Sequence, residues 1–87
     1  MSISKTFQAL SDQTRREILE LLKKQEMSVG EISQSFSISL PSLSHHLNVL
    51  KQVELISDRR KGQEKIYSIN LSVLEEVAST LLNIFKV

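Results

Sequence analysis

The chain has 87 residues, no cysteine and a formal net charge of +1, from eleven Lys and Arg against ten Asp and Glu. This length predicts one domain, residues 1–87. So short a chain hides only about 60% of its extended surface on folding, which leaves a second copy as a source of stability. The absence of cysteine excludes disulfides, thiolate metal sites and thiol redox sensing. We see neither a signal peptide nor an apolar run of the roughly 20 residues that span a bilayer, so we expect a cytoplasmic protein with no membrane insertion.

Apolar spacing and capping residues predict four helices in the first part of the chain. Residues 2–10 form the first helix, and Asp12 can cap the second. Residues 28–31, Ser-Val-Gly-Glu, have the spacing of a capping box and begin a third helix, with Phe36 facing inward. The fourth helix begins near Pro41, because proline is tolerated in a first turn.

The pattern changes after the fourth helix. Residues 55–60 and 64–69 alternate well enough for two strands, which join as a hairpin with its tip at Gly62. Asn70 or Ser72 can cap a last helix. We therefore predict a mainly α fold with a small β-hairpin, in the order helix, helix, helix, helix, strand, strand, helix.

The fourth helix has two contrasting faces. At about 100° per residue, its leucines at positions 43, 47 and 50 fall on one narrow apolar face. The opposite face is uncharged but rich in hydrogen-bonding groups, and it holds Ser44, His45, Asn48 and Gln52. Side chains of this kind read base edges in the major groove of DNA. The alternative is a merely polar surface helix, although an ordinary solvated face would usually carry Glu and Lys pairs.

The hairpin adds positive charge beside this helix. Two short helices joined by a brief turn, with a hairpin after the second, describe a winged helix-turn-helix, whose second helix enters the major groove. Residues 59–65 carry a local charge of +3, whereas residues 1–38 hold five charges of each sign. Phosphate contacts need such an asymmetry more than a high overall charge. The alternative is a charged tip that serves only solubility.

His45 and His46 invite a metal or a catalytic interpretation. Neighbouring helix positions diverge by about 100°, so the two rings do not easily converge on one ion, and no third ligand stands nearby. The sequence shows no nucleophile with a base, no glycine-rich phosphate loop and no acidic pair, so we expect neither an enzyme nor a cofactor. His46 borders the apolar face and suits packing or a phosphate contact, whereas His45 points outward as the better base reader.

The last helix carries more apolar surface than one contact needs. Leu74, Ala78, Leu81 and Phe85 form a stripe. Val73, Val77 and Ile84 lie beside it, and Leu82 falls elsewhere. A stripe this broad can serve its own core and also a second protomer. The alternative is a helix that is fully internal to one protomer.

Three segments in order resemble the arsenical-resistance (ArsR-type) family of winged helix-turn-helix repressors. Residues 10–19, LSDQTRREIL, are similar to the family's Leu-Ala/Ser-Asp-Pro-Thr-Arg-Arg-x-Ile-Leu run, with Gln13 at the usual proline. Residues 39–51, SLPSLSHHLNVLK, look like its recognition helix, and residues 60–63 with 66–69 look like its wing. Within the family, the chain looks nearest to the small, metal-independent autorepressors of the SdpR kind.

The resemblance implies a homodimer, joined through the first and last helices (about 2–10 and 71–86), on a palindromic operator in double-stranded DNA. It implies repression until a signal releases the protein, and that signal is a protein partner or nothing beyond autoregulation. Metal-sensing members carry Cys-x-Cys in the third helix or Asp and His sets in the last. Neither is present in this sequence, so no metal site is carried over.

The predicted sites follow from these faces and from the resemblance. The predicted DNA-binding set comprises groove-facing, backbone-facing and wing positions: Pro41, Ser42, Ser44, His45, His46, Asn48, Lys51, Arg59, Arg60, Lys61, Gln63 and Lys65. The predicted dimer interface comprises Ile3, Phe7, Leu74, Val77, Ala78, Leu81 and Phe85.

Arg15 and Arg16 leave two roles open. Either residue can touch a phosphate. Alternatively both are structural, with Arg15 reaching Asp12 and Arg16 reaching Asp12 or Glu20 at helical spacing.

Two other functions use the same fold. A winged-helix module can bind protein through these faces, but such modules generally lack the polar outer face of the fourth helix and the cationic wing. A sensor that responds to an unknown ligand is the second alternative.

Overall fold

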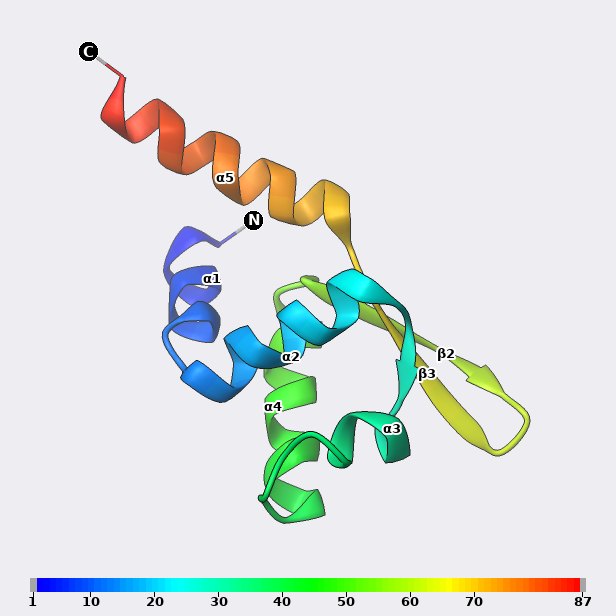
Figure 1. Ribbon diagram of the computed structural model, residues 1–87. Coiled ribbons are helices and arrows are strands. Elements are labelled where there is room, and N and C mark those ends of the chain that lie inside the picture. Colours follow the sequence, from blue (N-terminus) through cyan, green and yellow to red (C-terminus); the bar gives the residue numbers. More distant parts are fainter. Residues whose placement is uncertain (1, 87) are drawn as a thin grey trace.

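The computed structural model describes residues 2–86 of the chain (Figure 1). Its elements are, in order, α1 (Ile3–Leu10), α2 (Gln13–Lys24), β1 (Met27–Ser28), α3 (Val29–Ser33), α4 (Leu40–Gln52), β2 (Ile56–Lys61), β3 (Glu64–Ile69) and α5 (Leu71–Phe85). The predicted five helices and the hairpin are confirmed, and β1 is an additional strand that was not predicted.

Strand β1 links the helices to the hairpin. It pairs antiparallel with β3, placing Met27 opposite Tyr67 and Ser28 opposite Ile66, so the sheet has the order β1-β3-β2. Two residues are too few to show an alternating pattern, and Ser28 also starts the next helix, which explains why β1 escaped prediction. The short strand anchors the base of the hairpin beside α3.

The predicted caps of α2 and α3 are present. Asp12 accepts a hydrogen bond from the backbone N–H of Arg15 at the start of α2. Ser28 and Glu31 form both halves of the predicted capping box. Helix α3 is shorter than predicted, since it ends at Ser33, and Phe36 packs half-buried against the core from the following turn.

One apolar core joins α2, α3, α4, the sheet and α5. Its fully buried members are the apolar side chains on the inner faces of these elements: Ile18, Leu22, Ile32, Leu43, Leu47, Leu50, Leu55, Ile56, Tyr67 and Val77. Burial raises the pKa of the Tyr67 phenol above its ordinary value. The core fixes α4 against α2 and the sheet.

The chain leaves α4 through a tight turn. The backbone N–H of Glu54 donates to Lys51 O at 2.9 Å, and that of Leu55 donates to Leu50 O at 3.0 Å. This is the Schellman pattern, and it places Glu54 in the left-handed region with φ 63°. The turn directs the chain from the end of α4 into the hairpin.

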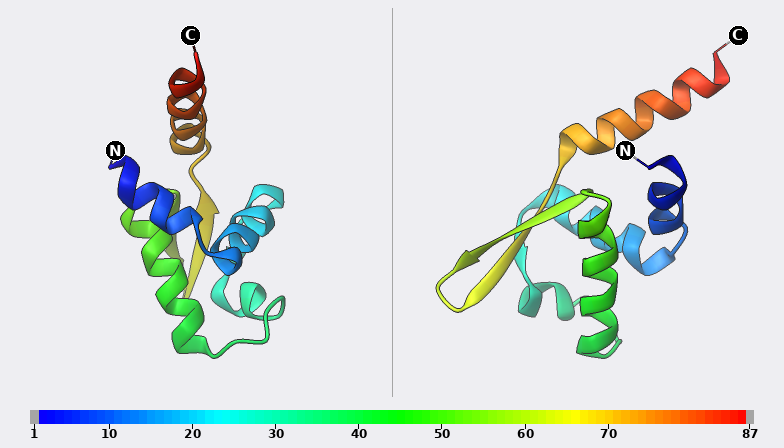
Figure 2. Two further views of the ribbon diagram at one scale, coloured as in Figure 1. Left: turned by 90° about the vertical axis from the view of Figure 1, so that its left-hand side faces the viewer. Right: turned by 180° about the vertical axis from the view of Figure 1, so that it is seen from behind.

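The molecule is elongated, with α5 at one end and the start of α4 and the hairpin tip toward the other. Helix α5 extends from the body near α1, whereas the start of α4 and the tip of the hairpin lie in the other half (Figures 1 and 2). Within residues 2–86, no helix is both long enough and apolar enough to cross a membrane.

Candidate nucleic-acid interface

Helix α4 is held at a defined rotation about its axis. Ser39 caps its start, because its Oγ accepts a hydrogen bond from the backbone N–H of Ser42 at 3.2 Å. Leu43, Leu47 and Leu50 are at most 1% exposed. Since these leucines lock one face against the core, the opposite face is turned to solvent.

The predicted groove-facing side chains lie on that exposed face. All five are exposed, and none is an acid, a lysine or an arginine: Pro41, Ser42, Ser44, His45 and Asn48. Their outward orientation agrees with the helical spacing in the sequence. Their contact with DNA stays a prediction.

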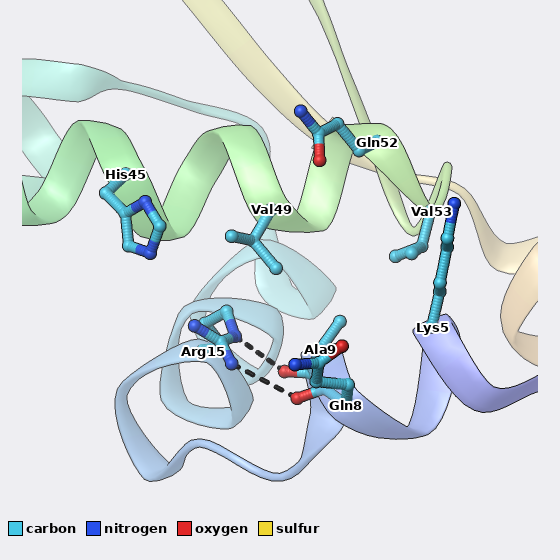
Figure 3. Close-up of a pocket in the computed structure, with 8 residues that line it drawn as sticks. All are labelled: Lys5, Gln8, Ala9, Arg15, His45, Val49, Gln52 and Val53. Atoms are coloured by element: carbon cyan, nitrogen blue, oxygen red, sulfur yellow. Dashed lines mark hydrogen bonds between the residues drawn. The ribbon is translucent and has the colours of Figure 1, made fainter.

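His46 points away from this face, toward the turn between α1 and α2. Its side chain is 17% exposed, and its Nδ1 lies 3.1 Å from Nη1 of Arg15 and 3.7 Å from Oδ2 of Asp12. Arg15 itself donates from Nε to Ala9 O at 2.7 Å and from Nη2 to Gln8 O at 3.1 Å (Figure 3). Of the two roles predicted for His46, this geometry supports packing and not a phosphate contact.

Arg15 and Arg16 have the structural role, but with partners that were not predicted. Arg16 donates from Nη1 to Leu10 O at 2.8 Å and forms no bond with the carboxylate of Asp12 or Glu20. Both arginines therefore bind carbonyl groups at the end of α1, where a helix leaves its last carbonyls without partners in its own turns. The Gln8 carbonyl also accepts from the backbone N–H and the hydroxyl of Ser11. Asp12 instead accepts from the backbone N–H of Arg15, and this bond lowers the pKa of the Asp12 carboxyl.

A groove of about 540 Å³ separates α1 from α4 beside the exposed face (Figure 3). It is lined by Lys5, Gln8, Ala9, Arg15, His45, Val49, Gln52 and Val53. None of these side chains is acidic, and two carry a permanent positive charge, so the groove favours an anionic group. Lys5 was not among the predicted site residues, because only the fold brings α1 next to α4.

Three of the predicted cations are already paired with acids. Arg59 forms two bonds of 2.7 Å with the carboxylate of Glu26, and this contact lowers the pKa of Glu26. Lys51 Nζ lies 3.0 Å from Oδ2 of Asp58, and Lys65 Nζ lies 4.0 Å from the same oxygen. These three cations share two carboxylates, which leaves a net charge of +1, and the geometry does not support Arg59 as a free contact to phosphate.

The tip of the hairpin keeps its positive charge. Arg60, Lys61 and Gln63 are exposed, and neither of the two cations forms an ion pair with another side chain in residues 2–86. Gly62 turns the chain with φ 64°, in the left-handed region that glycine adopts without a steric cost. Arg60 and Lys61 are thus the best placed of the predicted wing cations.

The two histidines do not form a metal site in the described chain. Their ring centroids lie 5.7 Å apart with a tilt of 54°, and His46 Nδ1 is directed at Arg15. Residues 2–86 contain no cluster of three or more His, Cys, Asp or Glu side chains that could hold an ion.

Helix α5 is apolar and largely uncovered. Leu82, Ile84 and Phe85 are 67%, 62% and 77% exposed. The prediction that Val77 belongs to the dimer interface is wrong, because Val77 is only 3% exposed and belongs to the core of its own chain. Leu74 also packs partly against that core.

The other predicted interface residues lie nearer the surface. Phe7, Ala78 and Leu81 are exposed, and Ile3 is half-buried. Ile84, which the sequence places beside the apolar stripe, and Leu82, which falls outside the stripe, are also exposed on α5.

Known proteins share this sequence and this fold. A family model described as "Bacterial regulatory protein, arsR family" matches residues 12–58. The transcriptional repressor SdpR of Bacillus subtilis (strain 168) is 53% identical over 81 residues, which span 93% of this chain and 90% of that protein. The arsenical resistance operon repressor of Staphylococcus aureus is 34% identical over 79 residues, spanning 91% of this chain and 76% of that protein.

Solved structures agree with these sequence matches. The crystal structure of the ArsR family transcriptional regulator RHA00566 has a TM-score of 0.84 at 29% identity, covering 92% of this chain and 82% of that one. The solution structure of the homodimeric winged helix-turn-helix domain of Mb0332 from Mycobacterium bovis has a TM-score of 0.78 at 28% identity, covering 92% and 75%. The resemblance seen in the sequence is confirmed, and the chain belongs to the ArsR family of bacterial regulatory proteins.

Proposed function

We propose that this chain is a transcriptional repressor that binds a palindromic operator in double-stranded DNA as a homodimer. The observation that carries the proposal is the exposed, uncharged polar face of α4, which lies opposite three fully buried leucines. In a helix-turn-helix, this face enters the major groove, where hydroxyl and imidazole groups can exchange hydrogen bonds with base edges. Ser42, Ser44, His45 and Asn48 are the proposed readers.

The phosphate backbone supplies the second set of proposed contacts. Half to two-thirds of protein–DNA hydrogen bonds go to phosphate and sugar, and they set the orientation of the protein. Arg60 and Lys61 at the hairpin tip are exposed cations with no acidic partner in the described chain. Lys5 lines the same groove as His45 and lies next to Val53 at the other end of that groove (Figure 3), so it is a further cation on this side of α4.

The dimer is proposed from the uncovered apolar face of α5 together with α1. Within the single domain of residues 1–87, the interface would comprise about residues 2–10 and 71–86. Phe85 and Leu82 are exposed on this surface, and the related domain of Mb0332 is described as homodimeric. A two-fold dimer presents two α4 helices about one turn of DNA apart, roughly 34–36 Å or a multiple, so its operator is a palindrome.

The relatives that are named as repressors support repression as the outcome of binding. We include in the proposal that the chain acts in the cytoplasm, regulates its own promoter and needs no metal. A protein partner that covers α4 or the hairpin tip would release the DNA, since both proposed contact surfaces lie at one end of the molecule.

The test begins with selection of bound sites from random duplex DNA, followed by measurement of affinity against salt concentration. His45→Ala should weaken operator binding by about 1–3 kcal/mol and flatten the preference at one position of each half-site. Lys61→Ala should weaken specific and non-specific DNA alike and lower the salt slope by about one unit per protomer contact. Lys24→Ala, at an exposed cation in the last turn of α2, is the matched control and should change neither quantity.

Failure to enrich any sequence would contradict the proposal. If His45→Ala kept the base preference and Lys61→Ala changed it, the hairpin would be the reading element. Added zinc or chelator should leave the affinity unchanged, and a stoichiometric zinc site that alters operator affinity would refute metal independence.

A further inference from the structure

The first turn of α4 carries an apolar side chain that the protomer does not use. Leu40, the first residue of the helix, is 57% exposed, and it is neither in the core nor among the residues packed against the core. Its neighbours Ser39 and Ser42 are polar, and they bond to each other, Oγ to Oγ at 3.0 Å. Leu40 therefore contributes little to the stability of the single chain.

Leu40 lies in the first turn of α4, at the border between the face of the buried leucines and the face that we propose enters the major groove. Leu40 and Ser44 are four residues apart, so their side chains lie one above the other on the helix surface. Helical side chains lean toward the N-terminus, which carries Leu40 beyond the start of the helix. In helix-turn-helix proteins, the N-terminal residues of the second helix contact base edges.

The proposed dimer surface does not explain this exposure. The start of α4 lies at the end of the molecule opposite α5, as two independent directions of view show (Figures 1 and 2). A second copy seated on α5 and α1 therefore leaves Leu40 uncovered.

The chemistry of the groove identifies the partner. Among the four bases, only thymine presents an apolar group in the major groove, its C5-methyl, and the other base edges present donors and acceptors. A leucine placed against those polar edges would desolvate them without replacing their hydrogen bonds. On the basis of the proposed function, we propose that Leu40 reads one thymine in each half-site by packing against its C5-methyl group.

Replacing thymine by deoxyuridine tests this contact, because it removes only the methyl group and leaves base pairing unchanged. Each thymine of the selected operator is replaced in turn, at the same position of both half-sites, and the affinity of the unaltered protein is measured. At one position we expect a loss of about fourfold per half-site, the equivalent of about 0.8 kcal/mol for one buried methyl or methylene group.

Two protein variants assign the contact to a residue. Leu40→Ala should bind the thymine and deoxyuridine operators equally. Ile38→Ala, the matched control at a neighbouring apolar residue that is 39% exposed, should keep the full difference. Circular dichroism and thermal melting should show that both variants are folded, since neither side chain is buried.

The outcomes separate this inference from the proposed function. If no duplex is enriched, the proposed function fails. If an operator is enriched but deoxyuridine has no effect at any thymine, DNA binding stands and the role of Leu40 is refuted. The role is refuted equally if Leu40→Ala keeps the sensitivity, or if only Ile38→Ala abolishes it.

Discussion

Replacing Arg15 tests how α1 and α4 are held together. Its guanidinium donates to Ala9 O and Gln8 O at the end of α1 and contacts His46 Nδ1 on α4. Arg15→Ala removes all three contacts at once. It leaves the carbonyl of the fully buried Ala9 without its partner.

The magnitude follows from the burial of these bonds. Hydrogen bonds to charged groups contribute about 1.5–3 kcal/mol each when they are shielded from water, and much less when exposed. The bonds to Ala9 and His46 are partly buried, whereas the bond to Gln8 is exposed. We therefore expect Arg15→Ala to lower the free energy of unfolding by about 2–4 kcal/mol. Arg15→Lys should recover only a small part of this lost stability, since an ammonium group cannot reach all three partners of the planar guanidinium.

Arg16→Ala is the matched control. Arg16 belongs to the same helix and makes one exposed bond, to Leu10 O, so its loss should cost about 0.5–1 kcal/mol. The assay is urea unfolding at one fixed protomer concentration, because dimerisation makes apparent stability depend on concentration. Equal losses of stability in the two variants would refute the role of Arg15 in holding α1 against α4. The phosphate contact that the sequence left open for Arg15 would then be the remaining interpretation.

Four further predictions concern caps, a strained turn and the dimer. Gln13→Pro should raise stability by roughly 0.4–1 kcal/mol in thermal melting, because Asp12 is the cap and Gln13 is the first helical residue; a lower melting temperature would contradict this. Because its folded-state pKa is lowered, the Asp12 carboxylate stabilises the fold above its unfolded pKa and loses this effect as pH falls through the folded value. The stability difference between wild type and Asp12→Asn should therefore shrink below about pH 4, and a pH-independent difference would be the contrary result. Glu54→Gly should raise the free energy of unfolding by roughly 0.5–1 kcal/mol in urea unfolding, since a residue with a Cβ is strained at φ 63° and glycine is not. Phe85→Glu should turn dimers into folded monomers in sedimentation, because an exposed residue of one protomer becomes a buried charge in the dimer; an unchanged dimer would exclude Phe85 from the interface.

Much of the fold could be predicted because its local signals are strong. The capping box at Ser28 and the spacing of the α4 leucines depend only on neighbouring residues, and both are present. Strand β1 could not be predicted, because its two residues owe their conformation to pairing with Tyr67 and Ile66, which lie far along the chain. No strand pairing of this kind explains why α3 ends at Ser33.

The site divides along the same line. The orientation of Ser44 and His45 follows from helical period alone, and the structure places both outward. The partners of charged groups depend on tertiary contact, so spacing suggested acids for Arg15 and Arg16 where main-chain carbonyls are bound. The burial of Val77 likewise could not be predicted, because the sequence does not show which residues of the apolar α5 stripe face the core and which face outward.

The distribution of charge explains how a chain of net charge +1 can be suited to specific binding. Beside the hairpin, Glu26 pairs with Arg59, and Asp58 pairs with Lys51 and Lys65. Among the cations of the hairpin, Arg60 and Lys61 are then the two without an acidic partner in residues 2–86. Non-specific affinity for DNA grows with the number of phosphates that a protein neutralises. A surface with few unpaired cations neutralises few phosphates, so its non-specific affinity is low. Under the proposed function, the preference for one sequence over bulk DNA would then depend mainly on the contacts of α4 with base edges. In the proposed complex, pairing of Arg59 and Lys51 with acids would thus lower the affinity for every DNA sequence, while the discrimination between sequences would come from the exposed face of α4.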